Sequence, residues 1–216
     1  MKKTKHWLFD FDGTLVDSMP HWGAAMVGEL EDHNIPYPEN IINIITPLGT
    51  AGTVKHFQSM GLNLPLEEIS AEIFARLVPV YRDIVPAKPC VIECLKKMKA
   101  AGYKLHILTA SPHIYLDPCL KRLGMFELFD NVLSSDVFGT GKTDPGIYGA
   151  VAERVGTEVS DITFLDDNIN ADKTAKFAGT QVIAVYDETS KADEEKMREL
   201  CDGYIYDFSE LENMLL

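Results

Sequence analysis

The chain reads His6-Trp7-Leu8-Phe9-Asp10-Phe11-Asp12-Gly13-Thr14 near its first residue, and this stretch decides the fold. Residues 6–9 form a short apolar run typical of a buried strand in a parallel sheet. Continued extended backbone would put Asp10 and Asp12 on the same side, where their carboxylates need a cation or a shared proton. Gly13 allows the chain to turn sharply beside a ligand. The stretch alone is also compatible with a strand that runs into an ordinary Asp-Gly turn.

Apolar runs and amphipathic stretches alternate through most of the chain, which predicts parallel strands joined by helices. After the first strand, we expect strands at residues 103–108, 131–133, 161–165, 181–185 and 204–206. We expect helices at residues 91–100, 147–155, 171–178 and 191–200. The pattern therefore indicates an α/β fold with a doubly wound parallel sheet.

The interval between residues 16 and 86 breaks this alternation, because it holds helical patterns and no convincing strand. The helical patterns cover residues 18–33, 52–60 and 66–82, and Ser18 is placed to N-cap the first of them. We therefore expect a core of residues 1–16 and 87–216 with an inserted α-helical cap domain of residues 17–86. A closing cap excludes water and contacts the substrate, so we expect it to move about hinges near residues 16–17 and 86–87.

The composition excludes several classes of partner. The 216 residues carry a formal net charge of −13, which disfavours binding to nucleic acid and to anionic lipid. No apolar run approaches the ~20 residues of a membrane-spanning helix, and the basic N-terminus is not followed by a signal-peptide core. We expect a cytoplasmic protein with no nucleic-acid or membrane partner, and the sequence carries no signal for an oligomeric state. A phosphorylated substrate would need a local positive charge.

The cysteines do not indicate a metal or disulfide site. No Cys-x-x-Cys pair occurs, and no histidine lies at zinc-ligand spacing from a cysteine. We expect Cys90, Cys94, Cys119 and Cys201 to be small core residues in a reducing compartment.

Polar residues follow three of the predicted strands. Asp10, Thr109 and the Asp166-Asp167 pair come at strand ends, and ligands of open parallel sheets bind beyond the carboxyl ends of the strands. Lys142 lies in a Gly-rich loop before a predicted helix. Each residue alone has an ordinary reading: a strand-end threonine, a solvated lysine, or an acidic first helical turn. If each ordinary reading were correct, their occurrence together in this order would require several coincidences.

Two other motifs fail on spacing. A calcium-binding EF-hand loop with its glycine at Gly13 would begin at Leu8 and end at Met19, so its first and last ligands are missing. Residues 141–143 read Gly-Lys-Thr like the end of a P-loop, but Asp136 stands where that motif requires its first glycine.

On the motifs around Asp10, Thr109, Lys142 and Asp166-Asp167, the chain resembles the haloacid dehalogenase-like hydrolase superfamily, in the helical-cap branch of phosphatases and β-phosphoglucomutases. The resemblance covers the whole chain and implies a Rossmann-like core with an inserted cap. The fourth motif departs from the common Gly-Asp pattern, because Asp166 stands at the glycine and Asp172 follows five residues after Asp167. The four motifs occur in order at residues 10–14, 107–109, 141–145 and 164–167.

The resemblance implies a magnesium-dependent phosphatase that acts on a small phosphorylated metabolite through an aspartyl phosphate. Asp10 would be the nucleophile, and Asp12 would protonate the leaving alcohol and then accept a proton from water. The presence of Asp12 favours phosphoryl transfer over dehalogenation. Thr109 and Lys142 would complete the catalytic set.

The same resemblance implies the ligand-binding residues. Gly13 and Ala110 would bind the phosphate together with Thr109 and Lys142. Mg²⁺ would be held by Asp10, the backbone carbonyl of Asp12 and Asp167, with Asp166 behind them. The choice among Asp166, Asp167 and Asp172 as the main ligand of the fourth motif stays open.

Two alternatives remain at the level of the sequence. A β-phosphoglucomutase-like phosphotransferase would need basic cap residues for a second phosphate; residues 46–52 contain no Lys or Arg, and Lys55 and His56 come slightly late. A phospho-accepting signalling module of the receiver type would need an Asp at the end of the third strand, and Asp136 comes too late for that. The insertion of about seventy residues also argues against a receiver domain. The candidates to line the substrate pocket from the cap are His21, Trp22, Lys55, His56 and Arg82.

Overall fold

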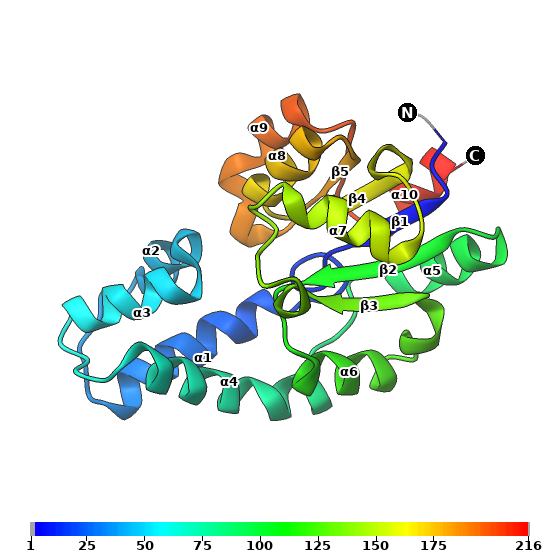
Figure 1. Cartoon of the computed structure of the whole chain (residues 1–216). Coiled ribbons are helices and arrows are strands. Elements are labelled where there is room, and N and C mark those ends of the chain that lie inside the picture. The colour runs from blue at the N-terminus through cyan, green and yellow to red at the C-terminus, as the bar shows by residue number, and fades with distance from the viewer. Residues whose placement is uncertain (1–2, 216) are drawn as a thin grey trace. The chain divides into compact units, whose positions relative to one another are not determined.

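The computed structural model describes residues 3–215 and divides into two compact units (Figure 1). The larger unit comprises Met1–Asp17 and Pro86–Leu216, and the smaller unit comprises Ser18–Val85. These limits lie one residue from the domain limits predicted from the sequence. The role of the smaller unit as a cap stays a prediction.

The larger unit is built on a six-stranded sheet in the order β3-β2-β1-β4-β5-β6, with every neighbouring pair parallel. The predicted α/β fold with a doubly wound parallel sheet is therefore confirmed. β1 and β5 have the predicted limits, and the other strands differ from prediction by one residue at one or both ends, the usual uncertainty of such limits. The strands are β1 His6–Phe9, β2 Lys104–Thr109, β3 Asn131–Ser134, β4 Ile162–Asp166, β5 Gln181–Val185 and β6 Gly203–Ile205.

Helices cover both faces of this sheet (Figure 1). The sequence predicts α5 and, within two residues, α7 and α8, whereas the predicted helix at 191–200 is a 3₁₀ turn, Glu188–Asp193, followed by α9. Two helices of the larger unit, α6 and α10, were not predicted. The helices are α5 Val91–Ala100, α6 His113–Arg122, α7 Gly146–Val155, α8 Ile169–Ala178, α9 Glu194–Leu200 and α10 Phe208–Leu215. Shorter 3₁₀ turns lie at Phe126–Leu128, Ser135–Phe138 and Val159–Asp161.

The alternation of side chains along β1 gives the sheet two apolar layers. Leu8 packs in one cluster with Phe164 of β4 and with buried residues of α7 and α8. Phe9 points to the opposite face, where its ring lies 6.2 Å from that of Phe129 and 6.3 Å from that of Phe208 in α10. Because β1 is buried on both faces, its sequence is a continuous apolar run rather than an alternating one.

The smaller unit contains helices and, among its described residues, no strand. Its helices are α1 Met19–Asp32, α2 Ile41–Ile45, α3 Gly49–Ser59 and α4 Leu66–Asp83, with a 3₁₀ turn at Thr46–Leu48. α4 buries Ile69, Ile73, Leu77 and Tyr81, one side chain every four residues. Ser18 occupies the N-cap position of α1, but its side chain makes no capping hydrogen bond.

The chain leaves and re-enters the larger unit through two adjacent segments. Val16 and Ala87 form an antiparallel bridge, and the Asp17 N–H donates a 3.0 Å hydrogen bond to the Pro86 carbonyl. Lys88 N–H likewise donates to the Leu15 carbonyl at 3.0 Å. The insertion therefore begins and ends at neighbouring points of the larger unit. Within residues 3–215 no helix has the length and apolar character needed to cross a membrane.

Candidate active site

Three strand ends bring buried polar side chains to one edge of the sheet. β1 lies between β2 and β4, and the Asp10 N–H continues the β1–β4 ladder with a 2.8 Å hydrogen bond to the Leu165 carbonyl. Thr109 is the last residue of β2, and Asp166 is the last residue of β4. Asp10, Thr109 and Asp166 are all buried, with exposures of 5% or less. Parallel strands in this order thus gather residues that lie about 150 positions apart in the sequence.

Lys142 places its ammonium group between two of these carboxylates. Its Nζ lies 2.7 Å from Asp10 Oδ1 and 2.5 Å from Asp166 Oδ2. The loop before α7 is anchored by the Tyr148 hydroxyl, which donates a 3.0 Å hydrogen bond to the Lys142 carbonyl. Burial acts to lower the pKa of Lys142, but the charges of Asp10 and Asp166 outweigh it and hold the pKa above its ordinary value. Lys142 is therefore a fixed positive charge.

Opposing effects act on the pKa of Asp10. Burial raises the pKa of Asp10 to about 7, and the charges of Asp166 and Asp12 act in the same direction. Lys142 acts against them through its charge and its hydrogen bond. The lysine therefore favours the ionised form of a carboxyl group that burial alone would neutralise.

Asp167 lies against a turn that only glycine fits. The Asp167 side chain is buried and accepts a 3.2 Å hydrogen bond from the Thr14 hydroxyl. A Cβ on Gly13 would lie 2.5 Å from Asp167 Oδ2, and Gly13 has a φ of +74°. Gly13 thus provides both the left-handed turn and the space that Asp167 occupies.

The carboxylates of Asp10, Asp166 and Asp167 form a cluster suited to a divalent cation. One oxygen from each lies within 4.8 Å of the others. Burial and the charges of Asp166 and Asp10 raise the pKa of Asp167 well above its ordinary value, which indicates uncompensated negative charge. Oxygen ligands of this kind suit Mg²⁺. The residues present therefore fit the predicted cofactor.

The two remaining acids of the fourth motif are engaged differently. Asp166 Oδ2 pairs with Lys142, and Asp166 Oδ1 accepts a 2.7 Å hydrogen bond from the Asn168 N–H. Asp172 is buried in α8, where Oδ2 accepts a 3.6 Å contact from Cys201 Sγ and Oδ1 accepts no hydrogen bond. Asp172 is not part of the three-carboxylate cluster found among the described residues.

Ser111 is a site residue that the sequence analysis missed. Its hydroxyl donates a hydrogen bond to Asp12 Oδ2, and its N–H donates a 3.0 Å hydrogen bond to Thr109 Oγ1. Ser111 thus links Asp12 to the end of β2. Its position two residues after a polar strand end was the signal that could have identified it. Ala110, between Thr109 and Ser111, is exposed.

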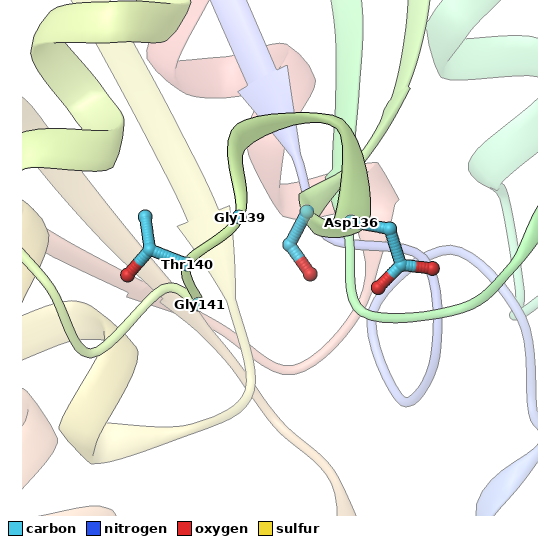
Figure 2. Close-up of a pocket in the computed structure, with 5 residues that line it drawn as sticks. Asp136, Gly139, Thr140 and Gly141 are labelled. Atoms are coloured by element: carbon cyan, nitrogen blue, oxygen red, sulfur yellow. The ribbon is translucent and has the colours of Figure 1, made fainter.

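An open pocket of about 440 Å³ lies in the loop that leads to Lys142. Figure 2 shows the Asp136 and Thr140 side chains on opposite sides of this hollow, with Gly139 and Gly141 in its wall. The Thr140 hydroxyl is engaged by Asp144 at 3.0 Å. The residues that line the pocket carry no positive charge: Ser135, Asp136, Gly139, Thr140 and Gly141.

The predicted pocket-lining residues of the insertion all lie in the smaller unit. Trp22 donates a 2.6 Å hydrogen bond from Nε1 to the Tyr81 hydroxyl and packs edge-on against Phe74. Trp22 is half-buried and is held within that unit by these two contacts. Arg82 pairs with its neighbour Asp83 at 2.6 Å.

Comparison with known proteins agrees with the motifs. The profile of the family described as haloacid dehalogenase-like hydrolase matches residues 4–179. A phosphoglycolate phosphatase of Psychrobacter arcticus is 30% identical over 172 residues, which cover 76% of this chain and 75% of that protein. A phosphorylated carbohydrates phosphatase of Thermotoga maritima is 27% identical over 177 residues, 82% of each chain.

The fold also matches solved structures. The crystal structure of a predicted phosphoglycolate phosphatase from Haemophilus somnus superposes with a TM-score of 0.83, 21% identity and full coverage of both chains. At this identity the likeness concerns the fold alone, whereas the family profile spans most of the chain, including the strand ends at Asp10, Thr109 and Asp166. The chain belongs to the haloacid dehalogenase-like hydrolases.

Proposed function

We propose that the protein is a magnesium-dependent phosphatase that hydrolyses the phosphoric monoester of a small soluble metabolite. The observation that carries this proposal is the position of Lys142 Nζ, 2.7 Å from Asp10 and 2.5 Å from Asp166. This arrangement supplies a local positive charge on a chain with a formal net charge of −13. A phosphoryl group is negatively charged, and a nearby cation stabilises that charge in the transition state of its transfer.

Asp10 is the proposed nucleophile. One of its carboxylate oxygens attacks phosphorus, the bond to the leaving oxygen breaks, and an aspartyl phosphate forms. Water then attacks the same phosphorus and releases inorganic phosphate, which regenerates Asp10. Lys142 favours the ionised, nucleophilic form of Asp10 and offsets the charge of the phosphoryl oxygens.

Asp12 is the proposed proton carrier. It donates a proton to the leaving alcohol in the first step and accepts one from the attacking water in the second. The hydrogen bond from Ser111 to Asp12 Oδ2 orients the carboxyl group. Thr109, at the end of β2, and the exposed Ala110 are proposed to lie against the phosphoryl group with Gly13.

Mg²⁺ is the proposed cofactor. Asp10, Asp167 and the backbone carbonyl of Asp12 would hold it, and Asp166 would stay paired with Lys142. A bound Mg²⁺ would contribute positive charge next to the phosphoryl oxygens and relieve the repulsion within the carboxylate cluster.

The substrate is proposed to be a phosphorylated carboxylic acid or sugar. The relatives are named for phosphoglycolate and for phosphorylated carbohydrates, both small and anionic. The smaller unit is proposed to act as a cap whose residues select among such substrates. The cytoplasmic location expected from the sequence stays a prediction.

A substrate panel with a matched inactive variant tests this function. The wild type should release phosphate from one or more phosphorylated acids or sugars with Mg²⁺, measured as kcat/KM for each. Asp10→Asn should bring turnover to the no-enzyme background and keep the far-UV circular dichroism of the wild type, because an amide cannot attack phosphorus and has nearly the same shape. Steady-state turnover by the Asp10→Asn variant would remove Asp10 from its role, and inactivity of the wild type on the whole panel would contradict the proposed activity.

A further inference from the structure

The smaller unit contains a second cluster of possible metal ligands, none of which is a proposed catalytic residue. Glu29 lies in the last turns of α1, His33 follows as the C-cap residue of that helix, and Glu72 lies in α4. His33 Nε2 lies 3.3 Å from Glu29 Oε1 and 3.4 Å from Glu72 Oε2. One ligand atom from each residue lies within 4.8 Å of the others.

Glu29 is the residue that distinguishes this cluster from a surface ion pair. Its side chain is fully buried, with an exposure of 0%, and Oε1 makes no hydrogen bond. The other oxygen, Oε2, lies 3.4 Å from Arg76 Nη2, whose closer partner is Asp32 at 2.7 Å. Arg76 therefore donates a long hydrogen bond to one oxygen of the Glu29 carboxylate, and the other oxygen, Oε1, lies within ion-pair distance of His33 but accepts no hydrogen bond. A buried carboxylate oxygen in this condition is costly unless a cation or a donor binds to it.

The distances match the edges of a small coordination polyhedron. Zinc–nitrogen and zinc–oxygen bonds of about 2.0–2.1 Å in a tetrahedron place neighbouring ligand atoms about 3.3–3.4 Å apart. The two measured distances from His33 Nε2 fall in this range. Both are long for a hydrogen bond between a histidine and a carboxylate, whose nitrogen–oxygen distance is about 2.7–2.9 Å.

We infer that Glu29, His33 and Glu72 form a binding site for a divalent transition-metal ion, with Zn²⁺ the best-suited probe. One imidazole nitrogen and two carboxylate oxygens suit Zn²⁺, whereas the all-oxygen cluster of the larger unit suits Mg²⁺. The side chains of His33 and Glu72 are 33% and 40% exposed, so an ion can enter from solvent. The fourth position would be taken by water. Bound metal would join α1 to α4 and stabilise the smaller unit.

Zinc stoichiometry in paired variants tests this site. The metal-free full-length chain is titrated with Zn²⁺ against a chromophoric chelator, because the carboxylates of the larger unit can also bind Zn²⁺ and only a difference is informative. The wild type should bind one more Zn²⁺ per chain than His33→Ala. His113→Ala is the matched control: His113 also has a carboxylate four residues away, Asp117 at 2.7 Å, but belongs to no three-ligand cluster among the described residues.

A second variant and a spectroscopic measurement distinguish loss of the zinc site from misfolding of the His33→Ala variant. Glu72→Gln changes a partly exposed residue and should weaken the same zinc site at least about tenfold, with an unchanged melting temperature of the metal-free protein. Co²⁺ should give visible absorption bands of a low-coordinate site in the wild type and in His113→Ala, and weaker bands in both cluster variants. Equal zinc stoichiometry and affinity in the wild type, His33→Ala and Glu72→Gln would overturn the inference. Because no substrate is used, this result is independent of the proposed phosphatase activity.

Discussion

Gly13 bears on the proposed metal site although it has no side chain. The Asp167 carboxylate occupies the volume that a Cβ at this position would take, 2.5 Å from Oδ2. Such a contact is shorter than real Cβ atoms make, and the φ of +74° strains any other residue. A side chain at residue 13 would have to displace the carboxylate that is proposed to bind Mg²⁺.

Gly13→Ala should therefore raise the Mg²⁺ concentration needed for half-maximal activity by about tenfold or more, because Asp167 can no longer occupy its position. Phosphate release measured across a Mg²⁺ titration would show the shift. Gly149→Ala is the matched control, because a Cβ at Gly149 in α7 meets nothing within 4 Å. In that helix interior alanine should leave the Mg²⁺ requirement unchanged and stabilise the fold by up to about 1 kcal/mol. Equal Mg²⁺ requirements for Gly13→Ala and the wild type would contradict the proposed role of Asp167.

Asp167 and Asp172 make a second pair for comparison. Asp167 directly follows β4 and belongs to the carboxylate cluster, whereas Asp172 lies in α8 with a cysteine as its hydrogen-bond partner. Asp167→Ala should raise the Mg²⁺ requirement far more than Asp172→Ala, as measured by titrating metal back into chelator-treated enzyme. If Asp172→Ala proves the more damaging, the assignment of ligands in the fourth motif is wrong.

At the residue scale, the sequence could predict which groups gather but not how they pair. Asp10, Lys142 and Asp166 were recognisable because their motifs occur in order. The 2.5 Å contact between Lys142 and Asp166 depends on the conformation of the loop before α7, which hydrophobic periodicity does not predict. Ser111 was missed for the same reason. A serine in a loop after a strand is common, and only the structure shows that it contacts Asp12.

At the scale of the elements, two histidine side chains, His6 of β1 and His106 of β2, are in contact. The rings of His6 and His106 stack with 5.3 Å between centroids, and His6 Nδ1 lies 3.1 Å from His106 Nε2. His106 Nδ1 lies 3.1 Å from the side-chain Nδ2 of Asn131 in β3, so His106 Nδ1 acts as acceptor and the ring hydrogen is assigned to Nε2. His106 is buried, and burial together with the charge of His6 lowers its pKa to about 4.

This strand contact should make stability fall on acidification. The folded-state pKa of His106 lies below the ordinary value of 6.5, so the unfolded chain takes up the proton first as the pH falls. The stabilising contribution is complete above pH 6.5 and is lost progressively towards pH 4. Between pH 7 and pH 5 it amounts to about 2 kcal/mol.

Urea unfolding at pH 7 and pH 5 checks this expectation. His106→Gln, which cannot titrate, should lose about 2 kcal/mol less stability over this interval than the wild type. His6→Gln should fall between the two, because it removes the charge beside His106 and the titration of His6 itself, whose pKa is also lowered by burial. The same loss in all three proteins would show that protonation of His106 does not drive the change.

The helices that the sequence analysis missed, α2, α6 and α10, lack a clear apolar periodicity for two physical reasons. α6 contains Pro118 within ten residues, and a proline inside a helix removes a backbone donor and obscures the pattern. α2 has five residues and α10 has eight, too short for several turns of apolar periodicity. Strands were easier to predict, because the buried parallel sheet requires continuous apolar runs at β1 and β5.

For the molecule as a whole, the insertion bears on the choice between hydrolysis and transfer. Residues 46–52 contain no lysine or arginine that could hold the second phosphate of a sugar bisphosphate. We therefore expect free phosphate from simple monoesters and no conversion of β-glucose 1-phosphate to glucose 6-phosphate, even with a bisphosphate primer. Coupled assays of phosphate and glucose 6-phosphate on the same samples measure both. Isomerisation with a kcat/KM above that of phosphate release would make the protein a mutase and would leave the proposed Asp10 chemistry in place.

The position of β1 in the middle of the sheet has a consequence during biosynthesis. His6 leaves the ribosome well before its two pairing partners, Lys104 and Ile162. At about 5–20 residues per second, Ile162 follows His6 by about 8–30 s. Ser18–Val85 emerges as a complete compact unit during this interval, while the apolar residues of β1 have no sheet to join. Trp7, Leu8 and Phe9 of the nascent chain therefore lack a neighbouring strand on at least one side until β4 has been synthesised.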